Sequence, residues 1–113
     1  MAQRANLTKD VNELLILARL REGPAHGYEI ALAIERDSRG AFSVQHGTLY
    51  PILHRLEGDG LIQGHWEREG GRRRKTYDLT EDGREHLEGE AREIKSLFID
   101  LIRALDVPTR AHG

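Results

Sequence analysis

The chain has 113 residues, 38% of them hydrophobic, with no cysteine and a formal net charge of -2 at pH 7. This length predicts one domain with a single core, which a second copy of the chain could extend. The lack of cysteine excludes disulfides, thiolate chemistry and thiol-based zinc sites. No apolar run approaches the roughly 20 residues that span a bilayer and the polar N-terminus lacks a signal-peptide core, so we expect a soluble, cytoplasmic protein.

Charge is distributed unevenly along the chain. The net value of -2 argues by itself against a nucleic-acid-binding protein, because phosphate neutralisation needs lysine and arginine. Residues 68–77, however, hold five basic side chains against one acid, Glu69, whereas residues 81–106 hold eight acids against four bases. A basic patch at one end of the molecule can steer a polyanion as well as a basic average does.

The first predicted helix follows residues 1–6, which are polar and expected to fray. Thr8 is the expected N-cap, and Gly23-Pro24 ends the helix. Its apolar residues recur at helical spacing and include Val11, Leu14, Leu15 and Ala18, widened by Leu17 and Leu20. Because this is more apolar than one buried face requires, we expect the helix to contact two surfaces.

The second predicted helix opens with the sequence HGYEI, residues 26–30, and ends before Asp37. Its core face is expected to consist of Ile30, Ala33 and Ile34. A loop then leads through Phe42, expected to be a core anchor, to Ser43. The Ser43 side chain is expected to cap the third helix by accepting from backbone N–H groups of its first turn.

The third predicted helix lies within GTLYPILHRLEGDGLI, residues 47–62. One face is apolar, with Leu49, Leu53 and Leu56, and Ile52 beside them. The other face carries hydrogen-bond donors and small groups in place of the usual Glu/Lys mixture, namely Gln45, His46, Thr48, Pro51, His54 and Arg55. Gly58 and Gly60 end the helix.

Pro51 leaves the start of this helix open. If the helix starts at Val44, Pro51 lies in its interior and removes a backbone hydrogen bond; if it starts nearer Gly47, Pro51 falls in the first turn at little cost. We favour an irregular first turn, which would leave N–H groups free at the end that meets a phosphate.

Two strands are predicted next, joined by a turn at Gly70-Gly71. Alternation places Ile62, Gly64 and Trp66 on one side, and Gln63, His65 and Glu67 on the other. The second strand runs over residues 73–79 with Tyr77 and Leu79 inward. Trp66 is expected to pack against the inner face of this ribbon as a core residue, in preference to acting as a ligand platform.

The tip of this ribbon carries Arg72, Arg73, Arg74 and Lys75. Consecutive cations repel one another, so a polyanionic partner explains them better than a solvated turn does. A helix with a buried row and a hydrogen-bonding row, followed at once by a basic ribbon, is the pattern of a winged helix-turn-helix.

The last predicted helix is capped by Thr80, with Glu81 and Asp82 in its first turn, and is ended by Pro108. Its apolar residues follow the alternating steps of four and three of a heptad seam: Leu87, Ala91, Ile94, Phe98, Leu101 and Leu105. Leu97, Ile99 and Ile102 broaden the seam. We expect a second protomer to cover it.

Signs of an enzyme are missing from the sequence. There is no nucleophile elbow, phosphate loop, pair of catalytic carboxylates or metal-ligand cluster. The six histidines are scattered and show no H-x-x-x-H spacing. We therefore expect neither an enzyme nor a protein that needs a metal or a cofactor.

The motifs HGYEI (residues 26–30), GTLYPILHRLEGDGLI (residues 47–62) and GRRRKTYDLTEDG (residues 71–83) together resemble the PadR family of bacterial transcriptional regulators, over roughly residues 10–90. The single C-terminal helix is similar to that of the small subfamily. The resemblance implies a homodimeric winged helix-turn-helix repressor that binds a palindromic operator, an inverted repeat in double-stranded DNA, and is released by a small molecule or another signal.

The resemblance also implies roles by position. Gln45, Thr48, Pro51 and His54 would face the major groove, Tyr50 and the backbone near Gly47 would hold phosphates, and Arg72 to Lys75 would lie on or in the minor groove. His26, Gly27 and Tyr28 would fix the start of the second helix near the DNA backbone. The full expected DNA-binding set is Tyr28, Gln45, His46, Gly47, Thr48, Tyr50, Pro51, His54, Arg55, Arg72, Arg73, Arg74 and Lys75.

The sequence thus predicts an α+β, mostly α fold. Residues 1–79 would form the winged helix-turn-helix domain, residues 80–107 the dimerisation helix and residues 108–113 a tail. The expected dimer interface is Val11, Leu14, Leu15, Leu87, Ala91, Ile94, Phe98, Leu101, Ile102 and Leu105. An effector cavity enclosed by the first and last helices would include Leu14, Phe98 and Asp100, although the last helix has no tryptophan to sandwich a flat drug.

A different function stays open beside DNA binding. The basic wing of a winged helix could bind an acidic protein partner, or the chain could sense an effector without specific DNA binding. Gel-shift titration at two salt concentrations separates these functions from that of an operator-binding regulator.

Overall fold

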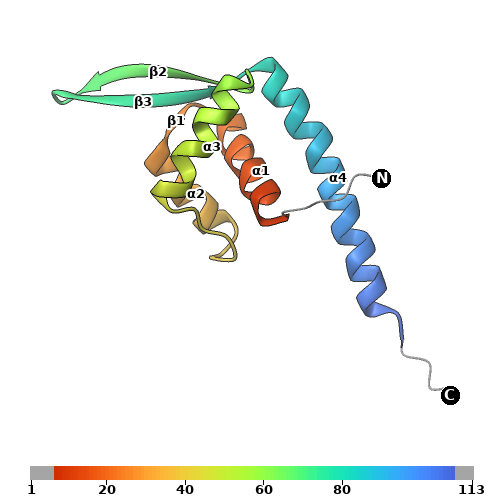
Figure 1. Ribbon diagram of the computed structural model, residues 1–113. Coiled ribbons are helices and arrows are strands. Elements are labelled where there is room, and N and C mark those ends of the chain that lie inside the picture. The colour runs from red at the N-terminus through yellow and green to blue at the C-terminus, as the bar shows by residue number, and fades with distance from the viewer. Residues whose placement is uncertain (1–6, 109–113) are drawn as a thin grey trace.

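The computed structural model describes residues 7–108, which form a mostly helical chain with one small antiparallel sheet (Figure 1). In chain order the elements are α1 (Leu7–Arg21), β1 (Ala25–His26), α2 (Gly27–Asp37), α3 (His46–Gly58), β2 (Ile62–Glu69), β3 (Arg72–Leu79) and α4 (Glu81–Asp106). β3 lies between β1 and β2 and is antiparallel to both. This is the predicted winged helix-turn-helix, followed by one long helix.

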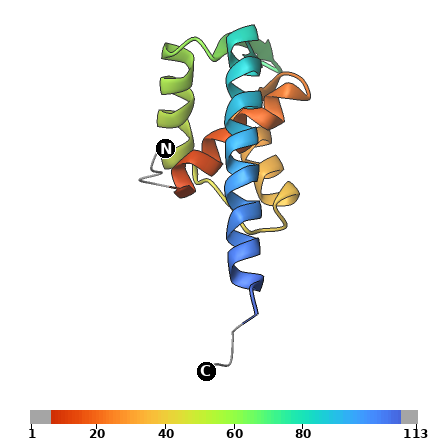
Figure 2. The same ribbon diagram turned by 90° about the vertical axis from the view of Figure 1, so that its right-hand side faces the viewer.

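Two elements project from the cluster formed by α1, α2 and α3. The ribbon of β2 and β3, which we call the wing, extends to the left in Figure 1, and α4 runs down the right-hand side. Figure 2 shows α4 passing alongside α1 and continuing beyond the cluster. Within residues 7–108, the wing and the second half of α4 therefore reach furthest from the core.

The core is built from one face of each helix and the base of the sheet. Its largest fully buried side chains are Ile16, Leu17, Ile30, Ile34, Leu49, Leu53, Leu56, Ile62 and Leu87. Each such side chain contributes about 1.5–3 kcal/mol through its removal from water. The core faces predicted for α2 and α3 are confirmed, because Ile30, Ala33, Ile34 and the leucines of α3 are all buried.

In α1 the buried face differs from the predicted stripe. Ile16, Leu17 and Leu20 are buried in the core, whereas Leu14 and Leu15 are only partly buried. Ile16 was absent from the stripe because a helix that is apolar on more than one side admits several stripes at helical spacing. The expected contact with two surfaces is confirmed, because α1 packs against α2, β3 and α4. The prediction of Thr8 as N-cap was wrong, because the helix already begins at Leu7.

The loop between α2 and α3 is held at its start, by Ser38. The Ser38 hydroxyl donates to the carbonyl of Ile34 at 2.7 Å and accepts from the Phe42 N–H at 3.0 Å. The prediction of Ser43 as N-cap of α3 was wrong: the N-cap is Gln45, whose side chain makes no capping hydrogen bond. Phe42 is partly buried against the core, and the nearby buried side chain is Val44.

Thr80 caps α4 as predicted. Its hydroxyl accepts from the Gly83 N–H at 2.9 Å and donates to the Gly60 carbonyl at 2.7 Å, so the cap also fixes the end of α3 to the start of α4. The heptad seam is used within the chain along its first half, where Leu87 and Ile94 are buried. Leu87 is 2% exposed, so its predicted role in the dimer interface conflicts with its place in the core.

Beyond Ile94 most of the seam is uncovered, although Phe98 is still partly buried. Exposed apolar side chains follow one another along the second half of α4: Leu97, Ile99, Leu101, Ile102, Leu105 and Val107. None of the helices within residues 7–108 has the length and apolar composition needed to cross a membrane. The residues expected to fray, 1–6, and most of the expected tail, 109–113, lie outside the described part of the chain.

Candidate nucleic-acid interface

The polar row of α3 is exposed, as expected for a recognition helix, the helix whose side chains contact base edges in DNA; we call it the reading helix. Gln45, His46, Gly47, Thr48, Pro51 and His54 all lie on the surface, and the Tyr50 side chain is 45% exposed. The opposite face of α3 is held in the core by Leu49, Leu53 and Leu56. The helix therefore presents one exposed row of donors, acceptors and small groups.

The first turns of α2 and α3 lie side by side. The ring of Tyr28 meets that of His46 edge-on, with centroids 6.4 Å apart, and His46 meets Tyr50 in the same way at 5.8 Å. Tyr50 also lies against Gly27, where an added Cβ would come within 2.5 Å of the tyrosine hydroxyl. Glycine at residue 27 thus leaves room for the Tyr50 ring beside the first turn of α2, and the positive dipole ends of two helices share one surface.

The start of α3 resolves the place of Pro51. The N–H groups of Thr48 and Leu49 both donate to the Gln45 carbonyl, at 2.9 and 2.8 Å, a shared acceptor that is common at helix ends and does not by itself make the first turn irregular. The helix begins at His46, and Pro51 lies inside it, beyond the first turn. Because proline has no N–H, the Gly47 carbonyl lacks its usual partner in the helix.

Arg55, predicted to face DNA, lies at the edge of the exposed row, and its side chain, 39% exposed, is engaged within the fold. Its Nη2 donates to Glu13 Oε2 of α1 at 2.7 Å, and its Nη1 lies 3.9 Å from Asp59 Oδ2. The hydrogen bond to Glu13 raises the pKa of Arg55 above its ordinary value. The side chain of Arg55 therefore joins α3 to α1.

His26 joins the start of α2 to the sheet. Its Nδ1 accepts from the Glu29 N–H at 3.4 Å, and Glu29 Oε1 accepts from the His26 N–H at 3.1 Å, which makes a reciprocal capping box. As part of β1, His26 also pairs with Thr76 of β3. Histidine is an unusual N-cap, so capping propensity gave little signal for this role, although the motif containing residues 26–28 did point to the start of α2.

The base of the wing is fixed to α3 by Glu57. Its carboxylate accepts from Lys75 Nζ at 2.9 Å and from the Gly64 N–H at 3.1 Å. The hydrogen bond from Lys75 lowers the pKa of Glu57, and the same bond raises the pKa of Lys75. Lys75, predicted at the basic tip, is thus partly buried and engaged at the wing base.

Trp66 lies on the wing surface, and the expectation that it packs in the core was wrong. It is 59% exposed, and the guanidinium carbon of Arg73 lies 4.6 Å from its ring centroid. The alternation of the strand was read correctly, since Gly64 and Trp66 share the side of the buried Tyr77. The ribbon, however, extends beyond the helices, so no core reaches as far as residue 66.

The other two arginines of the tip lie on the opposite face. Arg72 is the cross-strand partner of Glu69, and Arg74 that of Glu67. Arg74 also approaches His26, with Nη1 3.1 Å from Nε2. The four consecutive cations predicted as one basic tip are therefore divided between two faces. Sequence reasoning missed Trp66 and Arg68 as surface residues of the wing, although strand alternation and register could have placed both.

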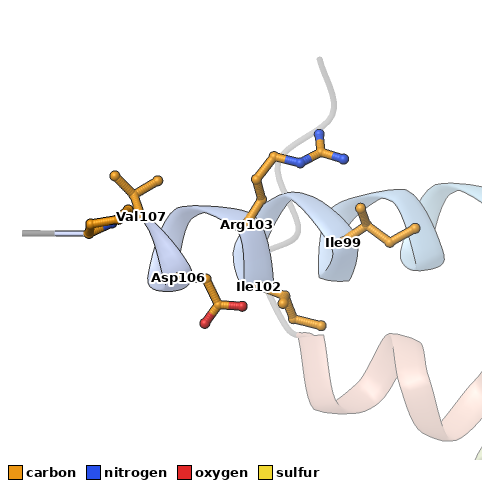
Figure 3. Close-up of a pocket in the computed structure, with 6 residues that line it drawn as sticks. Ile99, Ile102, Arg103, Asp106 and Val107 are labelled. Carbon is orange, nitrogen blue, oxygen red and sulfur yellow. The ribbon is translucent and has the colours of Figure 1, made fainter.

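The three residues predicted to line an effector cavity are not brought together. Leu14 and Phe98 are partly buried, whereas Asp100 is exposed on α4 and pairs with Arg103 at 3.8 Å. Asp100 lies two residues after Phe98 in α4, so their side chains point to opposite sides of the helix. The hollow on this helix, about 530 Å³, is lined by Ile99, Ile102, Arg103, Asp106, Val107 and Pro108 (Figure 3). It includes none of the three.

The described residues, 7–108, contain no candidate metal site. No group of three His, Asp or Glu side chains there could hold an ion. The surface formed by the first turns of α2 and α3 and by the wing instead offers backbone N–H groups, hydroxyls, imidazoles and guanidiniums. These are the groups that contact phosphates and base edges.

Comparison with known proteins identifies relatives across this whole unit. The model of the transcriptional regulator PadR-like family matches residues 16–89. A transcriptional regulator of Mycobacterium tuberculosis is 38% identical over 89 residues, which cover 79% of this chain and 80% of that protein. The negative transcriptional regulator PadR of Bacillus subtilis is 32% identical over 73 residues, 64% of this chain and 40% of that protein.

Similar solved structures extend the likeness to α4. A transcriptional regulator from Clostridium thermocellum superposes with a TM-score of 0.78 at 27% identity, over 89% of this chain and 98% of that one. The likeness therefore covers more of the chain than the residues 16–89 that the family model matches.

Proposed function

Because the chain belongs to the PadR-like family of transcriptional regulators, we propose that it is a repressor that binds an operator in double-stranded DNA as a homodimer. The family is one of DNA-binding regulators and not of enzymes. The observation that carries the finer proposal is the single surface on which the exposed row of α3, the first turn of α2 and the wing are combined.

This surface supports a division of tasks on DNA. Gln45, Thr48 and His54 are exposed along α3 and can donate or accept at base edges in the major groove. The N–H groups at the starts of α2 and α3, with Tyr28 and Tyr50 beside them, suit phosphate oxygens. The wing, which projects past these helices (Figure 1), suits the adjacent backbone or minor groove.

The uncovered half of α4 supports a homodimer. Leu101 is 47% exposed, Ile102 57% and Leu105 74%, and a row of such side chains on one helix is a pairing face. Val11, Leu14, Leu15, Ala91, Ile94 and Phe98, also predicted for the interface, lie on α1 and α4 and are buried or partly buried. A twofold dimer would present two reading helices and so select an inverted repeat.

Repression is supported by the similarity to a relative named as a negative regulator. A small-molecule effector would bind at the contact of α1 with α4, where Leu14 and Phe98 are partly buried, and so release the DNA. A ligand there would act on the spacing of the two reading helices. Such a regulator works in the cytoplasm, where bacterial DNA lies.

The test is a gel-shift titration and a footprint on the duplex that flanks the gene, at two salt concentrations. We expect a footprint with two half-sites one helical turn apart, or a multiple of it, and affinity that falls steeply with salt. Equal affinity for a mixed-sequence duplex, without a footprint, would contradict the proposal and favour a wing that binds an acidic protein partner.

A further inference from the structure

We propose that the DNA backbone contacts one particular face of the wing, formed by Trp66, Arg68 and Arg73, and that Trp66 is a DNA-contacting residue of this chain. We call this surface the indole face. The inference rests on the proposed function and specifies which wing side chains carry the contact, which the run of four basic residues in the sequence leaves open.

The register of the wing defines its two faces. Arg68 lies opposite Arg73, Trp66 opposite Lys75 and Gly64 opposite the buried Tyr77, and alternation places all of these on one side. The contacts agree, because Arg73 and Lys75 both lie over the Trp66 ring, at 4.6 and 5.7 Å from its centroid. On this same side Lys75 and Gly64 bind Glu57 of α3. The indole face is therefore continuous with the side of the wing that meets the reading helix.

The other face of the wing is balanced in charge. There Arg72 lies opposite Glu69, and Arg74 opposite Glu67. Closer to the base, His65 Nε2 lies 3.0 Å from Asp78 Oδ2. Opposite charges directly across a ladder stabilise one another. We call this surface the paired face, because each of its arginines lies opposite a glutamate in the ladder, although within residues 7–108 neither Arg72 nor Arg74 forms an ion pair with an acidic side chain.

The indole face, by contrast, has an excess of positive charge. Lys75 is paired with Glu57, but among residues 7–108 neither Arg68 nor Arg73 forms an ion pair with an acidic side chain. These two arginines face each other across the ladder, where like charges are destabilising. A phosphate backbone laid along this face would convert that repulsion into attraction to a common partner.

The stacking of Arg73 on Trp66 prepares the arginine for such a partner. A guanidinium over an indole uses the face of its plane, whereas hydrogen bonds to phosphate use its N–H edges, so both interactions can be made at once. Stacking also restricts the rotamers of a long side chain before binding, which reduces the entropy lost on binding. The exposed part of the indole adds an apolar surface and an N–H donor that can contact the sugar–phosphate backbone.

Trp66 is the only tryptophan of the chain, so its emission reports on this one position in the unmodified protein. We would titrate the protein with the duplex flanking its gene and with a mixed-sequence duplex of equal length. Emission is expected to change on addition of DNA and to saturate at the same concentrations as the gel shift. The Trp66→Phe variant, which keeps a ring for Arg73, should bind more tightly than Trp66→Ala.

Arginine variants provide a comparison at equal charge. Arg73→Ala, on the indole face, should weaken DNA binding roughly tenfold and lower the salt slope by about 1. Arg72→Ala, next to it in sequence but on the paired face, should change both quantities much less. Both side chains are exposed on the same strand, and circular dichroism would confirm that both variants are folded.

The outcomes separate this inference from the proposed function. Equal losses for Arg72→Ala and Arg73→Ala, or unchanged Trp66 emission during a normal gel shift, would overturn the indole face and leave DNA binding intact. Failure of the unmodified protein to shift either duplex would overturn the proposed function itself.

Discussion

Gly83, in the first turn of α4, lies directly against the backbone carbonyl of Leu61, at the base of the wing. That carbonyl is held in place because it accepts a hydrogen bond from the Thr80 N–H at 3.1 Å. A side chain at residue 83 would meet backbone, which cannot rotate away as a flexible side chain can. The direction in which α4 leaves the domain therefore depends on glycine at this position.

A matched pair of glycine substitutions tests this contact. Gly83→Ala should lower the free energy of unfolding by about 1–3 kcal/mol, because the new methyl group overpacks against the Leu61 backbone. Gly89→Ala, in the same helix but with open space around its Cα, should raise that free energy by about 0.5–1 kcal/mol through helix propensity. Chemical denaturation of both variants is the measurement. Two changes of the same sign would contradict the contact.

Neighbouring residues of α3 should separate stability from DNA reading. Arg55→Ala removes the hydrogen bond to Glu13 and should lower the free energy of unfolding by about 1 kcal/mol, without changing the preference for the operator. His54→Ala, on the exposed row, should leave stability within about 0.5 kcal/mol but weaken operator binding.

Thermal unfolding and gel shifts on the operator and on a mixed-sequence duplex measure these two effects. If Arg55→Ala is as stable as the unmodified protein but has lost its preference for the operator, the main role of Arg55 is not its hydrogen bond to Glu13 between α3 and α1.

The contact of Glu57 with Lys75 should appear in the pH dependence of stability. Because the pKa of Glu57 is lowered below its ordinary 4.5 in the folded state, its contribution is fully present above that value and is lost as pH falls through the folded pKa. Glu57→Gln should therefore be less stable at neutral pH by about 0.2–1 kcal/mol. The difference should shrink under acid conditions.

Urea denaturation at neutral and at acid pH measures this difference. Glu85→Gln, an exposed position of α4, is the control and should follow the unmodified protein throughout. A Glu57→Gln deficit that persists unchanged at low pH would show that the charge of Glu57 is not its cause.

The exposed half of α4 makes a prediction about assembly. Leu101→Glu places a charge in the apolar row and should convert a dimer to a monomer, with loss of operator binding, because both half-sites must be bound together. Ser96→Glu adds the same charge on the other side of the helix and should remain dimeric. Analytical ultracentrifugation distinguishes the two. A Leu101→Glu variant that sediments as a dimer would place the interface elsewhere.

Periodicity and end signals were sufficient for most of the fold. The steps of three and four in α2 and α3, the glycine turn at residues 70–71 and the threonine before α4 specified helices, ribbon and cap that the structure confirms. These features depend on neighbours in sequence, which is why the sequence reveals them. The family motifs span these same helix ends and the glycine turn, and so they indicated the same elements.

Side-chain partners distant in sequence could not be predicted in this way. Arg55 and Glu13 are 42 residues apart, and Lys75 and Glu57 are 18 apart, so no local pattern pairs them. Trp66 was misplaced for a related reason, because its burial depends on how far the ribbon extends past the helices. Ile16 was missed because an apolar helix does not reveal which of its faces meets the domain.

The two residues of β1 couple parts of the domain that the sequence keeps far apart. Ala25 pairs with Tyr77, and His26 pairs with Thr76 while also capping α2. The wing is thereby registered to the helices, and Glu57 fixes it to α3 from the other side. We expect α3 and the wing to keep a constant distance from each other, so that each protomer contacts a half-site of fixed length. Any variation in the spacing between the two half-sites would then have to be accommodated at the contact between the α4 helices of the two protomers.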